Sequence, residues 1–310
     1  EISANHNGNI INAKKLILAA KKNGADIVKL QTYEPRNMTI DSSRNDFLVK
    51  DGIWKGYKLW DLYKKAQTPL SWQKELFRYA KKINMPCFST PYDDEGVNLL
   101  KNLNSNLYKI SSFEMQDSSL VKKICKLGKP VIISTGLASL DEIKKTFSIA
   151  KNSGCQQLVL LYCVSSYPAK PSEYNLKTIE DMRKKFKVEV GISDHTIDNV
   201  TAISSIAFGC TLIEKHFTLD RNMEGPDHAA SLEFDEFKAL VKGISEVKQA
   251  MGTASARRLS QGEMINRENL GKSLVASIGL KKGTEISDEH IFLITESLVS
   301  KIMPDKTASP

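Results

Sequence analysis

Short apolar runs alternate with charged, helix-periodic stretches along most of this chain, and this alternation constrains the fold more than any other feature. The apolar side chains between Ala13 and Ala20 follow the i, i+3, i+4, i+7 spacing of a helix, and Gly24 is placed to end it. Residues 25–30 then form the first apolar run. Six further runs of this kind occupy residues 85–89, 107–111, 131–134, 158–163, 188–193 and 211–215.

Near-continuous apolar strands separated by amphipathic helices are typical of a parallel sheet covered by helices. Seven strands are visible, and an eighth would end at residues 1–3. Eight strand–helix units in about 250 residues predict a (β/α)8 TIM barrel, an α/β fold. A doubly wound open sheet is the alternative. No Gly-x-Gly-x-x-Gly follows an early strand, which disfavours the dinucleotide-binding form of that alternative.

Three segments depart from the alternation. Residues 34–67 are too long for an ordinary loop and carry Trp54 and Trp60, so we expect an ordered insertion over the barrel mouth. The last barrel helix is expected at about Phe234–Met251, which gives a catalytic domain over residues 1–252. The polar stretch 253–270 indicates a linker, and residues 271–310 predict the start of a small β-rich domain that is too short for a core of its own.

Composition excludes several classes of protein. Of the 310 residues, 41% are apolar and 26% charged, which is ordinary for a globular chain, and no apolar run approaches the ~18 residues of a membrane span. The net charge of +8 is spread over lysine doublets such as Lys14-Lys15, so no nucleic-acid partner is expected. The five cysteines form no Cys-x-x-Cys, which disfavours structural zinc or a disulfide framework and favours a reducing cytoplasm.

Two lysines lie inside otherwise apolar strands. In a barrel of this type the active site is at the C-terminal ends of the strands. A single such lysine, Lys29 or Lys109, would be consistent with a structural ion pair. Two of them, together with hydroxyl residues at neighbouring strand ends, favour a site for a doubly charged anion such as a phosphate or a phosphocarboxylate.

Two histidines end consecutive predicted strands and should face each other. A structural role is the alternative for either one, but His195 and His216, with Glu214 nearby, indicate a divalent-metal site. With two protein ligands, substrate oxygens and water would complete the coordination, as suits a Lewis acid that polarises a carbonyl group.

Eight ordered motifs connect these residues to a known family. The motifs, in order, are Glu1-Ile-Ser-Ala-Asn-His-Asn-Gly, Lys29-Leu-Gln-Thr-Tyr, Phe88-Ser-Thr-Pro-Tyr, Tyr108-Lys-Ile-Ser-Ser-Phe-Glu, Ser134-Thr-Gly, Ser193-Asp-His-Thr, Glu214-Lys-His-Phe-Thr and Gly225-Pro-Asp-His. With these motifs the chain resembles the sialic acid synthase family, which condenses phosphoenolpyruvate with an N-acylated hexosamine to make nonulosonic acids.

The resemblance implies an architecture, a partner and roles for individual residues. It implies a barrel followed by an antifreeze-like (SAF) domain that caps the partner's active site in a domain-swapped homodimer. Only the beginning of that domain is visible, from Lys272, and an arginine that the family uses there is not evident. By motif position, Lys29, Thr90, Lys109, Ser112, Ser134 and Ser193 would bind phosphoenolpyruvate, His195 and His216 would bind Mn²⁺ or Mg²⁺, Gln31, Tyr167 and Asp227 would contact the sugar, and Glu1 and Glu114, with Lys29 and Lys109, would act in catalysis.

The sugar and the reaction class each have an alternative. Several motifs resemble pseudaminic acid synthases, which are slightly favoured, whereas Gly225-Pro-Asp-His-Ala-Ala-Ser-Leu-Glu is more similar to the N-acetylneuraminate and legionaminate branches. At Ser165 neuraminate synthases tend to have asparagine. Among other classes, a Schiff-base aldolase would use Lys109 or Lys215 as its nucleophile, and a non-catalytic sugar-binding protein would need none of these strand-end groups.

Overall fold

The structure is a computed structural model that describes residues 1–253 and 257–295. The chain divides into two compact units, Glu1–Met251 and Gly252–Pro310. Part of the predicted small domain, residues 296–310, lies outside the described residues.

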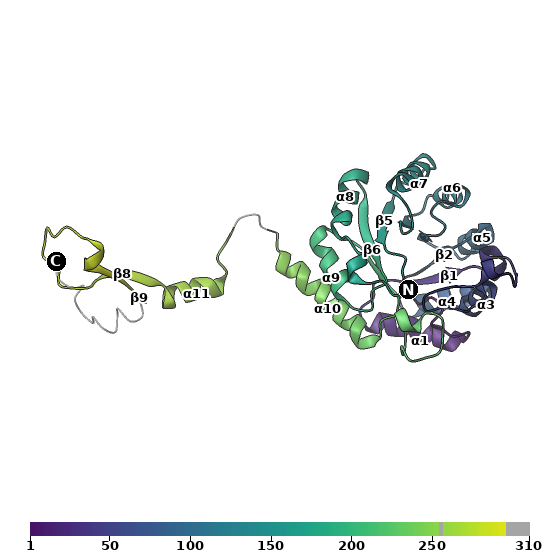
Figure 1. The fold of residues 1–310 in the computed structure, drawn as a ribbon, viewed down its shortest axis with the longest axis horizontal. Helices are drawn as coiled ribbons and strands as arrows, with labels where there is room; N and C mark the ends of the chain where they lie inside the picture. Colours follow the sequence, from purple (N-terminus) through teal and green to yellow (C-terminus); the bar gives the residue numbers. More distant parts are fainter. Residues whose placement is uncertain (254–256, 296–310) are drawn as a thin grey trace. The chain divides into compact units, whose positions relative to one another are not determined.

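A sheet of seven parallel strands curls through the first unit, and the strands are paired in sequence order, β1-β2-β3-β4-β5-β6-β7. Figure 1 shows the helices around the outside of this sheet. All seven predicted strands are confirmed, with ends shifted by up to three residues. They are β1 (Val28–Thr32), β2 (Cys87–Pro91), β3 (Tyr108–Ile110), β4 (Val131–Ser134), β5 (Leu158–Cys163), β6 (Glu189–Asp194) and β7 (Ile213–Lys215).

The helices lie between the strands, as the periodicity predicts. The predicted last helix is confirmed as α10 (Phe234–Met251). The others in this unit are α1 (Ile10–Lys22), α2 (Pro35–Met38), α3 (Leu59–Ala66), α4 (Leu70–Lys82), α5 (Asp94–Asn102), α6 (Ser118–Cys125), α7 (Leu140–Asn152), α8 (Lys177–Phe186) and α9 (Val200–Ser205).

Local sequence explains where these helices begin and end. In α7 the Ser139 hydroxyl accepts from the backbone N–H of Glu142 while the Glu142 carboxylate accepts from Ser139, a reciprocal capping box. Helix α1 ends at Asn23, and Gly24 follows with a φ of 89°, a left-handed conformation that glycine adopts without penalty. The apolar faces of α6, α7 and α8 pack on β3 to β6, in a core that includes Ile124, Ile133 and Ile179.

The predicted eighth strand is absent as a strand, which corrects that part of the prediction. Its place is held by two residues that bridge the first and last strands of the sheet. The N–H of Ile2 donates to the Lys29 carbonyl at 3.3 Å, and the N–H of Phe217 donates to the Glu1 carbonyl at 2.9 Å. The described sheet therefore has seven strands in a barrel-like curl, with Glu1 and Ile2 hydrogen-bonded to both of its edges.

The predicted insertion between β1 and α4 is ordered. It contains α2, a short 3-10 helix at Asn45–Phe47 and α3, and an isolated antiparallel bridge joins Leu48 to Lys58. The indole N–H of Trp54 donates to the carbonyl of Pro226 at 2.5 Å, which fastens this segment to the loop after β7.

The second unit begins with the stretch predicted as a linker. That stretch contains helix α11 (Gln261–Leu270), capped by Ser260 and Glu263. An antiparallel pair of strands, β8 (Lys272–Ala276) and β9 (Ile291–Thr295), follows. No described residue of this unit is buried. Across the described part of the chain, no helix has the length and apolarity needed to cross a membrane.

Candidate active site

A cavity of about 360 Å³ opens at the C-terminal ends of the strands. Its walls combine charged groups from the strands with aromatic and aliphatic groups from the insertion between β1 and α4. Ten of the thirteen site residues predicted from the sequence line it: Lys29, Gln31, Lys109, Ser112, Ser134, Tyr167, Ser193, His195, His216 and Asp227.

The two strand lysines meet at a single carboxylate. Lys109 Nζ lies 2.8 Å from Glu214 Oε2, and Lys29 Nζ lies 3.6 Å from Glu214 Oε1. Lys29 is also paired with the carboxylate of Glu1. All four side chains are largely shielded from water, so these ion pairs are screened far less than surface pairs.

The burial of this cluster moves its pKa values in opposite directions. Desolvation lowers the pKa of Lys29 to about 8. Burial alone would raise the pKa of Glu214, but Lys109 and Lys29 outweigh it and hold that pKa well below its ordinary range. Two ammonium groups and two carboxylates sum to zero charge. The sequence suggested a free cationic pair, whereas the structure gives each lysine a carboxylate partner, so an anion that enters must share the lysines with Glu1 and Glu214.

Hydroxyl groups from the ends of β3, β4 and β6 complete this side of the cavity. The Ser193 hydroxyl donates to Glu214 Oε1 at 3.2 Å, and the Ser112 hydroxyl accepts from the Gly136 N–H at 3.1 Å. A Cβ at Gly136 would lie 2.8 Å from the Ser112 oxygen and closer still to Ser165. Glycine is therefore required where the β4 loop, with Ser134 at its start, approaches β3 and β5.

The two predicted histidines face each other across the cavity wall, with ring centroids 5.5 Å apart. His195 Nδ1 lies 2.8 Å from the carbonyl of Val164, so in the neutral ring Nδ1 carries the proton and Nε2 keeps its lone pair. Burial lowers the pKa of His216, which favours its neutral form. Its Nδ1 is 3.5 Å from Asp227 Oδ2 and forms no hydrogen bond within the described residues.

These two imidazoles fit a metal-binding role in chemistry but supply few ligands. Imidazole nitrogen is a better ligand for zinc or copper than for Mn²⁺. Carboxylate oxygens and water are the preferred ligands of Mg²⁺ and Mn²⁺. No group of three or more His, Cys, Asp or Glu side chains in the described part of the chain is arranged to hold an ion. Any ion bound by His195 and His216 would therefore take further ligands from substrate and water.

The groups predicted to contact a sugar lie beside the histidines. Asp227 pairs with His216 and accepts from the Ser3 hydroxyl, and Gln31 Nε2 lies 3.3 Å from that same hydroxyl oxygen. Burial would raise the pKa of Asp227, but the nearby His216 imidazole outweighs it and lowers that pKa to about 2. The Tyr167 ring is 4.2 Å from the His195 ring, centroid to centroid.

The opposite wall of the cavity is apolar and comes mainly from the insertion between β1 and α4. Trp54 packs against Tyr167 with ring centroids 5.3 Å apart. The other apolar and aromatic groups of this wall are Tyr33, Met38, Val49, Leu59, Leu62, Tyr63, Ala66, Tyr92 and Phe113. The cavity thus has one ionic end and one apolar end, which suits a ligand with the same polarity.

Three predicted site residues do not line the cavity. The Glu1 carboxylate pairs with Lys29, which lines the cavity. The hydroxyl of Thr90 is fully buried in β2 and forms no hydrogen bond among the described residues. Burial raises the pKa values of Tyr63 and Tyr92, and the nearby Glu114 carboxyl adds to both shifts. Desolvation raises the pKa of Glu114 itself from its ordinary 4.5 to about 7.

The set of site residues predicted from the sequence leaves out Glu214, which contacts Lys29, Lys109 and Ser193. The alternation of side chains along β7 could have identified it. Successive side chains in a strand point to opposite faces, so if His216 faces the cavity, Glu214 must face it too. The wall residue Trp54 had no such signal, because its position depends on a contact with Pro226, far away in sequence.

Comparison with known proteins gives a consistent result. The NeuB family model matches residues 16–256. The chain is 41% identical to a pseudaminic acid synthase of Campylobacter jejuni over 94% of this chain and 84% of that protein. It is 39% identical to an N,N'-diacetyllegionaminic acid synthase of the same organism, over 94% of this chain and 87% of that protein.

A solved structure agrees with the sequence relatives. The N-acetylneuraminic acid synthetase of Leptospira borgpetersenii, solved in complex with citrate, superimposes with a TM-score of 0.75 at 29% identity, over 86% of this chain and 89% of that one. The family match covers far more than half of the chain, and the relatives match nearly all of it. The chain therefore belongs to the NeuB family of sialic acid synthases.

Proposed function

We propose that this protein condenses phosphoenolpyruvate with the open-chain aldehyde of an N-acylated hexosamine and releases phosphate. The product is a nine-carbon, sialic-type acid. The observation that carries the proposal is the joining of Lys29 and Lys109 in one cavity with His195 and His216. An ionic end for a phosphorylated acid and a histidine pair beside an acceptor region are what such a condensation requires.

Phosphoenolpyruvate would bind at the ionic end. Each lysine ammonium has three N–H donors, and one donor of Lys109 forms a hydrogen bond to Glu214. The remaining protons, with the hydroxyls of Ser112, Ser134 and Ser193, would contact the phosphate and carboxylate groups. Thr90 would contribute only after a shift, because its hydroxyl is buried away from the cavity.

The acceptor sugar would lie between Gln31, Tyr167 and Asp227 and the apolar wall. We favour the acceptor of a pseudaminic acid synthase, since the two Campylobacter jejuni relatives of this name are 41% identical and a deoxygenated, acylated sugar suits an apolar wall. The preference over the acceptors of legionaminic acid synthases, at 39%, is small. N-acetylneuraminate-9-phosphate synthase of mouse, at 31%, is more distant.

The reaction balances with a C–C bond and a C–O bond to water formed, the C–O bond to phosphate broken, and a proton from water passed to the aldehyde oxygen. C3 of phosphoenolpyruvate attacks the aldehyde carbon, water adds at C2, and phosphate leaves with its bridging oxygen. Holding both substrates in one cavity supplies much of the rate, and the fixed lysines stabilise charge that develops on the phosphate. A divalent ion held by His195 and His216, Mn²⁺ or Mg²⁺, would act as a Lewis acid toward the aldehyde oxygen.

Proton transfer would involve the two remaining carboxylates. Glu1 is held by Lys29 at the ionic end, close to where water would add to phosphoenolpyruvate. Glu114, with its pKa near 7, can donate or accept a proton at neutral pH.

The decisive experiment is release of inorganic phosphate by the full chain. We expect release to require both phosphoenolpyruvate and an N-acyl hexosamine, with the product identified by mass spectrometry. The acceptors to compare are N-acetylmannosamine and diacetylated dideoxyhexoses. Release with no acylated amino sugar would contradict the proposal, and activity that is indifferent to chelator but trapped by borohydride on a lysine would favour a Schiff-base aldolase.

Glu114 provides a test through stability. Because its folded pKa is raised, the folded protein keeps this carboxyl neutral between pH 4.5 and 7 while the unfolded chain ionises it. The stability that this group contributes is present below pH 4.5 and is lost as the pH rises through 7. We expect Glu114→Gln to match the wild type at pH 4.5 and to exceed it by about 2 kcal/mol at pH 8, a figure that follows from about 1.4 kcal/mol per pKa unit with a discount for partial exposure.

Urea unfolding at the two pH values measures this difference. Glu142→Gln is the matched control, because its exposed carboxylate has a lowered pKa and caps α7. That substitution should destabilise the protein at pH 8. Equal stability of Glu114→Gln and the wild type at pH 8 would contradict the buried, neutral carboxyl.

The small unit is proposed to act on a second copy of the chain. Its described residues leave Leu274, Ile286 and Leu293 at 59–65% exposure, an apolar surface that needs a partner. In line with the family resemblance, we expect it to be part of an SAF domain that caps the neighbouring protomer in a domain-swapped homodimer. The full chain should sediment as a dimer.

Shortening the chain tests this assembly. A chain that ends at Met251 keeps the first compact unit, so we expect it to fold, to bind phosphoenolpyruvate and to lose kcat/KM for the sugar by about tenfold or more. A shortened monomer with undiminished sugar kinetics would rule out the capping role.

A further inference from the structure

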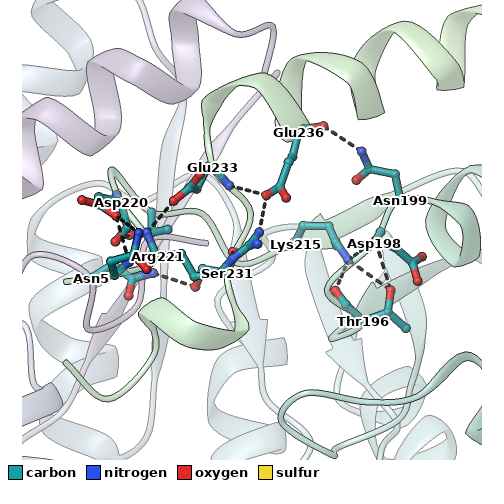
Figure 2. A network of polar contacts seen from close by, with 12 residues as sticks. Asn5, Thr196, Asp198, Asn199, Lys215, Asp220, Arg221, Ser231, Glu233 and Glu236 are labelled. Carbon is teal, nitrogen blue, oxygen red and sulfur yellow. Dashed lines mark hydrogen bonds and ion pairs between the residues drawn. The ribbon is translucent and has the colours of Figure 1, made fainter. Parts of the chain in front are cut away.

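One buried ammonium organises the loop that carries His195. Lys215 Nζ lies 2.9 Å from Asp194 Oδ2, 2.5 Å from the Thr196 carbonyl and 3.0 Å from the Asp198 carbonyl. Figure 2 shows Lys215 pointing toward Thr196 and Asp198. The lysine is only 4% exposed. With the Thr196 hydroxyl at 3.3 Å, four oxygens of residues 194–198 surround the three protons of this ammonium.

Lys215 does not face the active-site cavity. It lies in β7 between Glu214 and His216, both of which line the cavity, whereas Lys215 does not. Since strand side chains alternate between faces, Lys215 points away from the substrate region. This geometry argues against Lys215 as the Schiff-base nucleophile of the aldolase alternative and leaves the purpose of its ammonium to be explained.

The two residues that flank His195 are hydrogen-bonded to each other. The Asp194 carboxylate accepts from the Thr196 N–H and the Thr196 hydroxyl, each at 3.0 Å. Both neighbours of His195 in sequence are therefore bound to Lys215 and to each other. The His195 N–H donates to the Tyr174 hydroxyl at 3.1 Å, and its ring is bonded to the Val164 carbonyl.

The same polar network continues toward Asp227, on the other side of the histidine pair. Asn199, just beyond the loop, donates to the Glu236 carbonyl at 2.8 Å, and the Glu236 carboxylate pairs with Arg221 (Figure 2). Arg221 Nε donates to the Ser231 carbonyl at 3.2 Å, and the Ser231 hydroxyl donates to the Asp227 carbonyl at 2.7 Å. The loops after β6 and β7 are thereby connected through the start of α10.

We propose that Lys215 is a positioning residue that fixes His195 relative to His216. Because the next residue after Lys215 is His216, one side chain links the strand ends that carry the two imidazoles. This inference rests on the proposed role of the histidine pair in the condensation. Without the ammonium, the Asp194 carboxylate and two loop carbonyls lose their shared donor, and residues 194–198 must rearrange to find other partners.

The test uses Lys215→Met in the full chain, which keeps most of the side-chain volume and removes the donor. The readout that needs no metal is the ¹⁵N NMR signal of the His195 Nδ1–H, in protein labelled only at its five histidines and assigned with His195→Ala. We expect a slowly exchanging signal in the wild type and its loss or a large shift in Lys215→Met. An unchanged signal would overturn the proposal.

A second readout is the dissociation constant of Mn²⁺, measured by calorimetry without substrate. Groups that orient metal-binding histidines typically change metal affinity 10- to 100-fold. We expect the dissociation constant of Lys215→Met to rise by about that factor and kcat to fall similarly, with KM for phosphoenolpyruvate within about threefold of the wild type. Affinity within threefold of the wild type would also overturn the proposal.

Two further variants keep the test decisive. If Lys215→Met does not fold, Asp194→Asn removes the ionic part of the contact at nearly constant shape and should show the same changes in smaller size. Lys123→Met removes a surface lysine that pairs with Asp94 at 2.9 Å, and it should leave every readout unchanged. If the wild type binds no Mn²⁺, the proposed metal role fails by itself, and the NMR comparison still decides the role of Lys215.

Discussion

Lys109→Met should lower kcat/KM for phosphoenolpyruvate by about 100- to 1,000-fold. Truncating one partner of a buried, hydrogen-bonded charge pair costs about 2–5 kcal/mol, and each 1.4 kcal/mol is tenfold. Lys109 is 1% exposed and its ammonium is 2.8 Å from Glu214. Its loss changes the net charge of Lys29, Lys109, Glu1 and Glu214 from zero to −1, which repels a phosphorylated acid. Phosphate release at varied phosphoenolpyruvate measures the effect.

Two controls separate binding from folding in this prediction. Lys144→Met removes an exposed lysine that pairs with Asp141 on α7, and it should leave kcat/KM unchanged. Adding Glu214→Gln to Lys109→Met removes the carboxylate left without its closest partner, so it should recover stability but not activity. A Lys109→Met protein within tenfold of wild-type kcat/KM would contradict the proposed binding of phosphoenolpyruvate by this lysine.

The sequence predicts the strands and the strand-end chemistry because both follow from local pattern. A lysine inside an apolar run, as at Lys29 and Lys109, is visible without any tertiary information. The rule that barrel sites lie at the C-terminal strand ends then brings distant motifs together. The same rule places His195 opposite His216, and the structure has their rings 5.5 Å apart.

What the sequence does not predict depends on contacts between distant segments. The charge balance at Glu214 is one example, because two lysines from β1 and β3 must approach a single carboxylate from β7. The contacts of Lys215 are another example. Its oxygen partners come from the end of β6 and the loop that follows, and two of them are backbone carbonyls, which every residue type has. Helix α11 lies within the stretch that the sequence predicts as a linker, because that stretch is polar and rich in Ser, Arg and Glu.

Substituting the histidines should have the other large effect, with His195→Ala or His216→Ala lowering kcat by about a hundredfold or more. Each change removes one of only two imidazoles at the proposed metal site. Both side chains line the cavity, but His195 is only 4% exposed and its ring is hydrogen-bonded to the Val164 carbonyl. We therefore expect the unfolding free energy to fall by less than about 1 kcal/mol in His216→Ala and by about 1–3 kcal/mol in His195→Ala. Measurements of kcat with added Mn²⁺ and of urea unfolding give the two numbers.

His6 supplies the contrast that makes this result specific. Its ring is fully buried, accepts from the Gly8 N–H and contacts the Thr68 hydroxyl at 3.1 Å, and burial lowers its pKa to about 4. His6→Ala should therefore cost stability, about 1–3 kcal/mol for the groups left unpaired, while the response of kcat to Mn²⁺ persists. In the two cavity variants, by contrast, the response of kcat to Mn²⁺ should be lost. Metal-dependent activity within tenfold of the wild type in either cavity variant would show that His195 and His216 are structural, because a site with two protein ligands cannot lose one and keep its ion in place.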